Sequence, residues 1–190
     1  MLLLVGLGNP GPKDINNRHN IGFRIIDAVN SHFKLSKQKP KFKGLLTTGI
    51  ISENKVYAIK PLTFMNNSGT AIKELIDYFK IDAKNVIVFH DDLDIDFGKI
   101  KAKFGGGSAG HHGIESIDKF IGKDYSRVRI GIGHPKSKKK VNNHVLEDFK
   151  EDEEDQIKEI AENIVKLIPT LLEKKIDLFS SKVNQSLNGI

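Results

Sequence analysis

Three glycines near the start of the chain have the spacing of a nucleotide-binding loop. The stretch LLLVGLGNPG, residues 2–11, ends an apolar run with the pattern G-x-G-x-x-G, formed by Gly6, Gly8 and Gly11. Such a fingerprint needs a helix that begins at its second or third glycine, so that free amide groups face a pyrophosphate. Pro10 and Pro12 remove amide donors there, and the polar segment PKDINNRHN follows before any helical periodicity. We therefore do not expect a dinucleotide site.

The stretch DDLDIDFGK has the alternating carboxylates of a calcium loop, which are Asp92, Asp94 and Asp96. The pattern fails further along, because Phe97 occupies the position of the required glycine and Lys103 that of the bidentate glutamate. We do not expect calcium to bind here.

The chain contains seven histidines, of which His90, His111 and His112 lie near these acids in the sequence. Metal sites made of histidine usually show a fixed ligand spacing such as HExxH, and no such spacing is present. We therefore expect neither a structural nor a catalytic metal.

Length and composition limit what the chain can be. Its 190 residues, 38% hydrophobic and 28% charged, suit one soluble domain, residues 1–190. It has no cysteine, no signal-peptide pattern after Met1 and no apolar run of the roughly 20 residues that cross a bilayer, so we expect a cytoplasmic protein without a membrane partner. A net charge of +6 favours an anionic partner such as nucleic acid, although a merely soluble basic surface explains it equally well.

Alternating apolar strands and amphipathic helices predict an α/β fold, in which helices flank a twisted, mixed β-sheet. Strands are expected at 2–6, 85–92, 99–104 and 127–133, and residues 43–61 predict an antiparallel hairpin that turns at 52–54. Helices are expected at 20–33, at 68–81 with Ser68 as its cap, at about 109–121, and at 151–174 with a solvated acidic first turn. The polar end of 85–92 lies where open sheets usually place function.

Six polar clusters accompany these elements in order: GLGNPG, NRHN, TFMNNSG, FHDDLD, GGGSAGHHG and RIGIGHP. Together they resemble the bacterial-type peptidyl-tRNA hydrolase family, over nearly the whole chain. The resemblance implies a monomeric α/β hydrolase without a cofactor. Such an enzyme cleaves the ester between a peptide and the 3′-terminal ribose of tRNA, and so recycles peptidyl-tRNA released early from ribosomes.

Within this resemblance, His19 of NRHN matches the family's essential histidine, and Asp91 of FHDDLD matches the acid that holds it. A histidine can take a proton from water near pH 7, and a carboxylate partner raises its basicity and fixes its tautomer. Without the other motifs, a loop histidine with no role would be the simpler interpretation of His19. A nucleophilic serine is the chemical rival for ester cleavage, but the chain has no G-x-S-x-G elbow.

The resemblance also implies a cleft for the peptide. Asn9 and Asn66 match amide side chains that bind the peptide backbone, since an amide can donate to a developing oxyanion and accept from an N–H. Met65 matches an apolar wall, although plain core filling explains a methionine equally well. His111 is a further substrate-binding candidate, and its helix and the glycines of 105–110 would close one side of the cleft, unless the glycine run is only a mobile connection.

Two positions in the substrate cleft depart from the family pattern. Where the family usually has tyrosine after NPG, this chain has Asp14 or, with a one-residue slip, Ile15. We expect this change to alter how the peptide packs. Where the family has asparagine after the glycine-loop histidine, this chain has His112. An imidazole keeps one donor but becomes charged in mild acid, so we expect a reduced rate or a shifted pH optimum.

Four basic residues are candidates for binding the acceptor stem and 3′ end of tRNA. Lys101 and Lys103 alternate along one predicted strand, and Arg127 and Arg129 along another, so each pair points to one face. Lys103 and Arg129 match the family's clamp on an acceptor-stem phosphate, which gives affinity without reading sequence. The run KSKKK at 136–140 predicts a solvated loop that extends the positive field.

Two other functions remain open on sequence alone. A noncatalytic RNA-binding relative of the same fold would bind tRNA without turnover, and a nucleotide-dependent oxidoreductase, the more distant alternative, would bind nicotinamide or flavin. The sequence also leaves open whether the C-terminal helix covers the site and whether the substrate 2′-hydroxyl shares the base role with His19.

Overall fold

The computed structural model describes residues 1–135 and 140–189, so most of the predicted basic loop at 136–140 lies outside the described residues. The strands are β1 (Leu2–Gly6), β2 (Lys39–Lys41), β3 (Gly44–Ile51), β4 (Asn54–Pro61), β5 (Val86–Asp92), β6 (Ile100–Phe104) and β7 (Ser126–Gly131). The helices are α1 (Ile21–His32), α2 (Ser68–Phe79), α3 (His112–Ile121), α4 (Val141–Leu146), α5 (Glu151–Leu172) and α6 (Ile176–Leu187).

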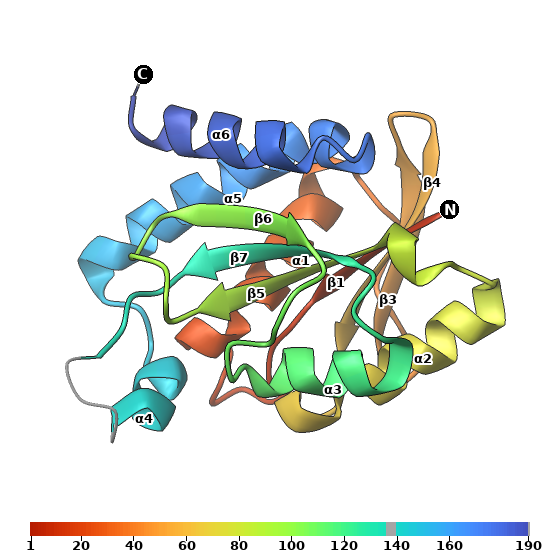
Figure 1. Ribbon diagram of the computed structural model, residues 1–190, viewed down its shortest axis with the longest axis horizontal. Coiled ribbons are helices and arrows are strands. Elements are labelled where there is room, and N and C mark those ends of the chain that lie inside the picture. The colour runs from red at the N-terminus through yellow and green to blue at the C-terminus, as the bar shows by residue number, and fades with distance from the viewer. Residues whose placement is uncertain (136–139, 190) are drawn as a thin grey trace.

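The strands form one seven-stranded sheet in the order β2-β3-β4-β1-β5-β7-β6. Strands β4, β1, β5 and β7 run parallel to one another, whereas β3 is antiparallel to β4 and to β2, and β6 is antiparallel to β7. Helices cover both faces of this sheet (Figure 1). The predicted α/β class with a mixed sheet is therefore confirmed.

Side-chain alternation along β1 divides the core between the two faces of the sheet. Leu2 and Leu4 pack with α1, α5 and α6, whereas Leu3 and Val5 pack with α2 and α3. A strand that is covered on both sides must be apolar at every position, and β1 is. The carboxyl ends of β1, β4 and β5 consequently meet at one edge of a rigid, buried sheet.

Close packing explains two of the three glycines that suggested a nucleotide site. A Cβ on Gly6 would lie 2.2 Å from the carbonyl oxygen of Gly22, so the glycine lets α1 approach the end of β1. A Cβ on Gly8 would lie 2.8 Å from the ring of Phe23. Since α1 begins only at Ile21, no helix starts at the second or third glycine of the pattern.

The hairpin is confirmed, with β3 and β4 antiparallel and Ile51 paired with Asn54. Its two turn residues, Ser52 and Glu53, have positive φ angles of 45° and 66°, as a two-residue hairpin turn requires.

The predicted cap of α2 is wrong. Ser68 is the first residue of the helix, and its hydroxyl donates to the carbonyl oxygen of Met65 at 2.9 Å. The reason is a 3-10 turn, Met65–Asn67, that runs directly into α2 and leaves Asn67 at the cap position without a side-chain bond.

The sequence analysis did not identify α4 or α6. Helix α6 lies along the free edge of β6, where the Asn184 side chain bonds both backbone groups of Ile100 and the Ser180 hydroxyl accepts from the Ala102 N–H. These bonds satisfy strand groups that would otherwise be unpaired. Helix α6 therefore protects an edge of the sheet, and the helix that approaches the cleft is α4.

Candidate active site

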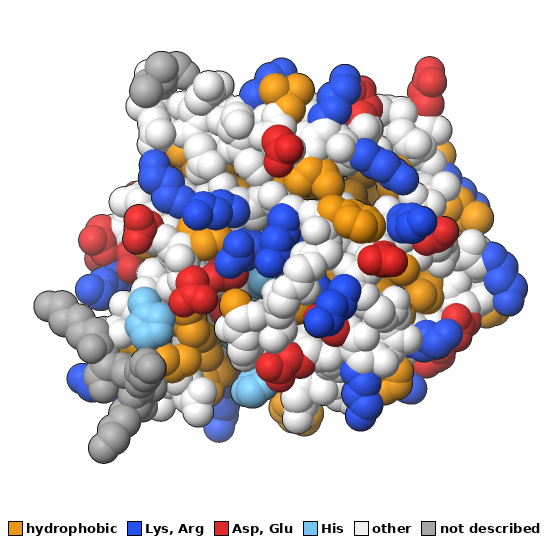
Figure 2. All heavy atoms as spheres, in the orientation of Figure 1, with side chains coloured by type: hydrophobic (Ala, Val, Ile, Leu, Met, Phe, Trp, Pro, Cys, Tyr) orange, Lys and Arg blue, Asp and Glu red, His pale blue; other side chains and the backbone are white. Residues whose placement is uncertain are grey.

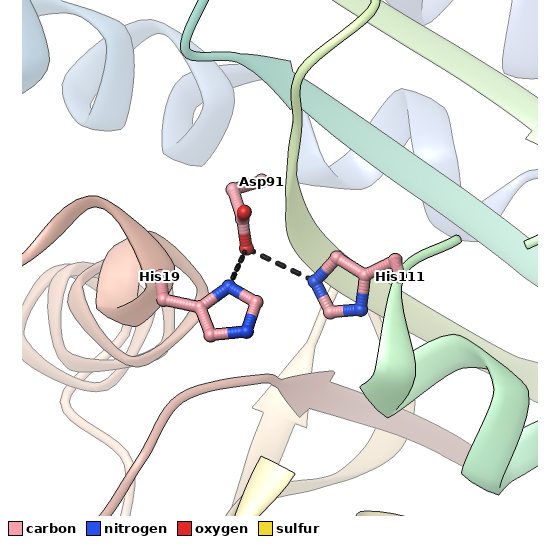
Figure 3. A group of neighbouring side chains, drawn as sticks. All are labelled: His19, Asp91 and His111. Atoms are coloured by element: carbon pink, nitrogen blue, oxygen red, sulfur yellow. Dashed lines mark hydrogen bonds and ion pairs between the residues drawn. The ribbon is translucent and has the colours of Figure 1, made fainter. Parts of the chain in front are cut away.

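His19 lies in a short 3-10 turn, Arg18–Asn20, that leads from the loop after β1 into α1. The residue is only 8% exposed. Its Nδ1 is 2.8 Å from Oδ1 of Asp91, near the carboxyl end of β5 (Figure 3). The structure thus brings together the two residues of the predicted general base, although 72 positions separate them in the chain.

A second histidine contacts the same carboxylate oxygen. The Nε2 of His111 lies 3.0 Å from Oδ1 of Asp91 (Figure 3). The Nδ1 of His111 accepts from the backbone N–H groups of Gly113 and Ile114, which makes His111 the N-cap of α3. A nitrogen that accepts two N–H groups carries no proton, so His111 has its proton on Nε2 and donates it to Asp91.

The same reasoning fixes the tautomer of His19. An ionised carboxylate only accepts hydrogen bonds, so neutral His19 donates from Nδ1 to Asp91 and carries a lone pair on Nε2. Within the described residues Nε2 has no hydrogen-bond partner, and His19 lines the cleft described below. The arrangement therefore presents a basic nitrogen to whatever occupies the cleft.

His19, Asp91 and His111 also have the types and closeness of a metal triad, with ligand atoms within 4.8 Å of one another. The cap that His111 makes on α3 argues against metal binding by this triad. His111 would have to offer a lone pair on Nε2 and move its proton to Nδ1, where two N–H groups already point. The trio is therefore built as a hydrogen-bonded cluster around one carboxylate.

Burial and charge shift the pKa values of His19 and Asp91 in opposite directions. Burial alone would lower the pKa of His19, but the charge of Asp91 and the hydrogen bond to it raise the pKa above its ordinary value. Burial would raise the pKa of Asp91, but His19 and His111 hold it well below its ordinary range. Asp91 thus stays ionised, and His19 is a stronger base than an isolated histidine.

His90, which the sequence analysis gave no role, lies directly behind this cluster. Burial, followed by the charge of His111, keeps the pKa of His90 well below its ordinary value, so the ring is neutral. Its Nδ1 donates to the backbone oxygen of Asp91 at 2.7 Å, and its ring centre is 4.8 Å from that of His111. His90 therefore supports the cluster without adding a second positive charge beside it.

Asn9 is held so that its amide nitrogen is available. Its Oδ1 accepts from the backbone N–H of Met65 at 2.9 Å. Its backbone N–H donates to Oδ1 of Asn20 at 2.8 Å, and its backbone oxygen accepts from Nδ2 of Asn20 at 2.9 Å. The NH₂ group makes no bond to another described residue, and Asn9 lines the cleft with His19. These two bonds to Asn20 hold the backbone of Asn9 in place. Asn20 belongs to the motif NRHN but was not predicted to have a role.

The cleft joins most of the predicted substrate-binding residues. Asn9, His19, Met65, Asn66 and His112 line it together. Three residues of α4 and one exposed aromatic complete the lining and were not predicted: Asn142, Val145, Leu146 and Phe64. Phe64 lies within the motif TFMNNSG, which could have indicated it, whereas the exposed apolar side chain of Leu146 is not recognisable as exposed from the sequence.

Asp14 lies beside the cleft and does not line it. Its Oδ1 accepts from the side-chain amide of Asn17 at 3.0 Å, and its charge contributes to the raised pKa of His19. His112, the second departure from the family pattern, does line the cleft, where its Nδ1 is 3.2 Å from Oε2 of Glu115 on the exposed start of α3.

The predicted basic residues share one sheet face but differ in exposure. In the β6–β7 pair, Lys101 lies opposite Arg129 and Lys103 opposite Arg127. Figure 2 shows Lys and Arg side chains gathering over these two strands. The position of Arg127 does not favour the expected contact with tRNA, because the residue is 1% exposed and bonds Asp118 and the Gly107 carbonyl. Alternation places a side chain on a face but does not say what covers it.

Lys103 and Arg129 remain accessible. The Nε of Arg129 is 2.7 Å from Oδ2 of Asp92, the residue after Asp91. Partial burial, then the charges of Arg129 and Arg127, lower the pKa of Lys103. A Cβ on Gly106 would lie 2.7 Å from Nζ of Lys103, so the glycine loop leaves room for this amine. A bound anion would relieve the repulsion between these cations.

No helix of the described residues is long and apolar enough to cross a bilayer.

Comparisons with known proteins agree with this geometry. A family model described as peptidyl-tRNA hydrolase matches residues 3–189. The chain is 71% identical over 184 residues to peptidyl-tRNA hydrolase of Pelagibacter ubique, covering 97% of this chain and 99% of the relative. It is 44% identical over 189 residues to that of Bartonella henselae, covering 100% and 98%.

A solved structure has the same fold along nearly its whole length. The crystal structure of peptidyl-tRNA hydrolase from Acinetobacter baumannii matches with a TM-score of 0.91 at 33% identity, covering 97% of this chain and 94% of that one. The predicted family is thereby confirmed, and the chain belongs to the peptidyl-tRNA hydrolase family.

Proposed function

We propose that this protein hydrolyses the ester bond between peptide and tRNA in peptidyl-tRNA, and so recycles tRNA released prematurely from ribosomes. Family membership supports this reaction. The observation that carries the chemistry is the histidine–aspartate pair, in which Asp91 fixes His19 with a free Nε2 at the cleft.

In this proposal His19 is a general base. Its Nε2 takes a proton from a water molecule, and the water oxygen attacks the ester carbonyl carbon. The NH₂ groups of Asn9 and Asn66, which both line the cleft, donate to the carbonyl oxygen as it becomes negative. Collapse of the tetrahedral intermediate breaks the bond to the ribose 3′-oxygen, which takes the proton back from Nε2. Free peptide and tRNA leave, and His19 is neutral again.

The peptide lies in the cleft of Met65, Phe64 and Leu146, and His111 acts on the substrate only through Asp91. The acceptor stem lies over β6 and β7, where Lys101, Lys103 and Arg129 meet its phosphates. Arg127 instead anchors the glycine loop through Gly107. We further propose that the enzyme acts as a monomer in the cytoplasm and needs no metal or cofactor.

An assay of ester turnover separates this function from the noncatalytic RNA-binding alternative. The purified protein is expected to release peptide from peptidyl-tRNA over many turnovers in the presence of a metal chelator. Binding of tRNA with no release above the uncatalysed rate would favour the alternative.

We expect Lys103 and Arg129 to contribute to the binding of peptidyl-tRNA. Lys103→Ala and Arg129→Ala should each raise KM for peptidyl-tRNA and lower the slope of log KM against log salt by about one counterion, because each change removes one phosphate contact. Lys158→Ala is the control, since Lys158 is 67% exposed on α5, which packs on the opposite face of the sheet. A small peptidyl ester without an acceptor stem should be hydrolysed equally by all variants. An unchanged salt slope with full-length tRNA would remove these two residues from the binding surface.

A further inference from the structure

Residues 141–150, which we call the covering segment, form one wall of the cleft. Asn142, Val145 and Leu146 of this segment line the cleft beside His19. None of the residues of α4 is fully buried, so packing alone holds this helix weakly. The place of the cleft wall must therefore depend on specific tethers. One is His144, whose Nε2 bonds the carbonyl oxygen of Ile132 at 3.1 Å.

Arg18, the residue directly before His19, supplies the other tethers. Its backbone N–H donates to the carbonyl oxygen of Glu147 at 3.0 Å. Its Nη1 donates to the carbonyl oxygens of Asp148, at 2.6 Å, and of Glu147, at 3.3 Å. An isolated antiparallel bridge between Asn17 and Asp148 lies alongside. The turn that presents His19 and the covering segment are thus joined along their backbones.

The other nitrogen of the guanidinium reaches α5. Its Nη2 is 2.6 Å from Oε2 of Glu153, and the same oxygen accepts from the backbone N–H of Lys150 at 2.8 Å, at the start of the helix. The Cζ of Arg18 lies 5.2 Å from the ring centre of Phe149, and its side chain is only 4% exposed. The planar guanidinium bonds the carbonyl oxygens through one terminal nitrogen and the carboxylate through the other, a geometry that the single nitrogen of a lysine does not reproduce.

We propose that Arg18 is a positioning residue, which fixes the covering segment relative to the Nε2 of His19 and so sets where Val145 and Leu146 meet the peptide. The proposal rests on the proposed function, because it takes the peptide of peptidyl-tRNA as the occupant of the cleft. Arg18 has no part in the proton transfer, since Asp91 orients the imidazole from β5.

The chain contains a matched control. Arg24 on α1 pairs with Glu154 on α5, with Nη1 2.9 Å from Oε1, and its Cζ lies 5.6 Å from the same Phe149 ring. Within the described residues Arg24 makes no hydrogen bond to the covering segment, which it contacts only through the Phe149 ring. Arg24→Met therefore removes a similar ion pair and the same ring contact while leaving the tethers in place.

The test measures kinetics and hydrogen exchange on the full chain. Arg18→Met should raise KM for peptidyl-tRNA about tenfold, because the cleft wall is misplaced, and should speed amide exchange within 141–150. The acid limb of the pH–rate profile should not move, because the His19–Asp91 bond is intact. Arg24→Met should leave KM within about twofold of the parent and exchange in 141–150 unchanged. Equal effects of the two variants on KM and on exchange would overturn the proposal.

Two further variants keep the test decisive. Arg18→Lys retains a charge opposite Glu153 but lacks the guanidinium fork, so it should behave like Arg18→Met. Full recovery of KM and of the exchange rate would overturn the proposal.

If Arg18→Met does not fold, Glu153→Gln replaces it, since a glutamine oxygen can still accept from Lys150 N–H. It should speed exchange in 141–150, and an unchanged rate would count against the tether. A parent enzyme without turnover would defeat the proposed function, whereas the exchange results test the tether separately.

Discussion

His19→Ala is expected to lower kcat for peptidyl-tRNA by roughly 100-fold or more, because the variant lacks the general base. KM and tRNA affinity should stay close to those of the parent, since the loss concerns the transition state and the phosphate contacts lie on β6 and β7. Steady-state kinetics with peptidyl-tRNA, together with direct tRNA binding, measure both quantities.

The control is His32→Ala, which removes an exposed histidine at the end of α1 and should leave kcat unchanged. A His19→Ala enzyme that works at nearly the parent rate would show that the base is elsewhere. If instead kcat falls together with tRNA affinity, the residue acts in binding or folding and the base assignment loses its support.

The pH dependence of the parent gives an independent measure of this base. Only neutral His19 can take a proton, so kcat/KM should fall as the pH drops through the pKa of His19. Because Asp91 raises this pKa, the acid limb should lie above the ordinary histidine value of about 6.5. The acid limb of the parent is also the reference for the Asp91→Asn variant.

The positions of His19, Asp91 and Asn9 could be predicted in part from the sequence, because they depend on strand ends. Asn9 follows β1 and Asp91 is the second-last residue of β5, and these strands are neighbours in the sheet. Each apolar run shows where its strand ends, and neighbouring parallel strands bring their carboxyl ends together. The motifs of the family supplied the pairing of His19 with Asp91, which no spacing rule could give.

The role of His111 could not be predicted, because it depends on where one helix begins. The helix expected from about 109 places His111 inside its first turn, whereas in the structure His111 is the N-cap of α3, where Nδ1 accepts two backbone N–H groups and Nε2 contacts Asp91. The helix begins at His112, three residues later than expected, and this shift changes the role of the His111 side chain. The assignment of His111 to the substrate rather than to Asp91 followed from this uncertainty.

The missed helices differ in what their sequences offered. In α6 the buried residues Phe179 and Val183 are four apart, so a helical stripe was present and could have been used. In α4 the apolar residues Val141 and Val145 are also four apart, but the helix has only six residues, so the pattern is too short to predict a helix. Its position depends on tethers from Arg18 and His144, which are long-range contacts that periodicity does not encode.

Asp91→Asn should lower kcat/KM near neutral pH by roughly 100-fold, because the amide cannot stabilise the imidazolium that forms when His19 takes a proton. The shape of the side chain is kept, so the cleft should still bind tRNA. The pH profile gives the sharper result. With the charge gone, burial is the larger influence on His19 and lowers its pKa, so the acid limb should move to lower pH than in the parent.

Asp92→Asn is the matched control, since it removes the neighbouring carboxylate, which bonds Arg129 and not His19. This change should leave the acid limb in place and alter KM for peptidyl-tRNA. An acid limb that stays fixed in Asp91→Asn, or that moves equally in both variants, would mean that Asp91 does not set the basicity of His19.

The double variant His19→Ala, Asp91→Asn then tests whether the two residues act as one unit. If Asp91 works only through His19, its removal has little left to affect once the imidazole is gone, and the double variant should be no slower than His19→Ala by more than about twofold. A further large loss would mean that Asp91 contacts the reacting groups itself, through a water or through His111. Such an outcome would contradict the proposed division of roles, in which the aspartate orients the histidine and the histidine transfers the proton.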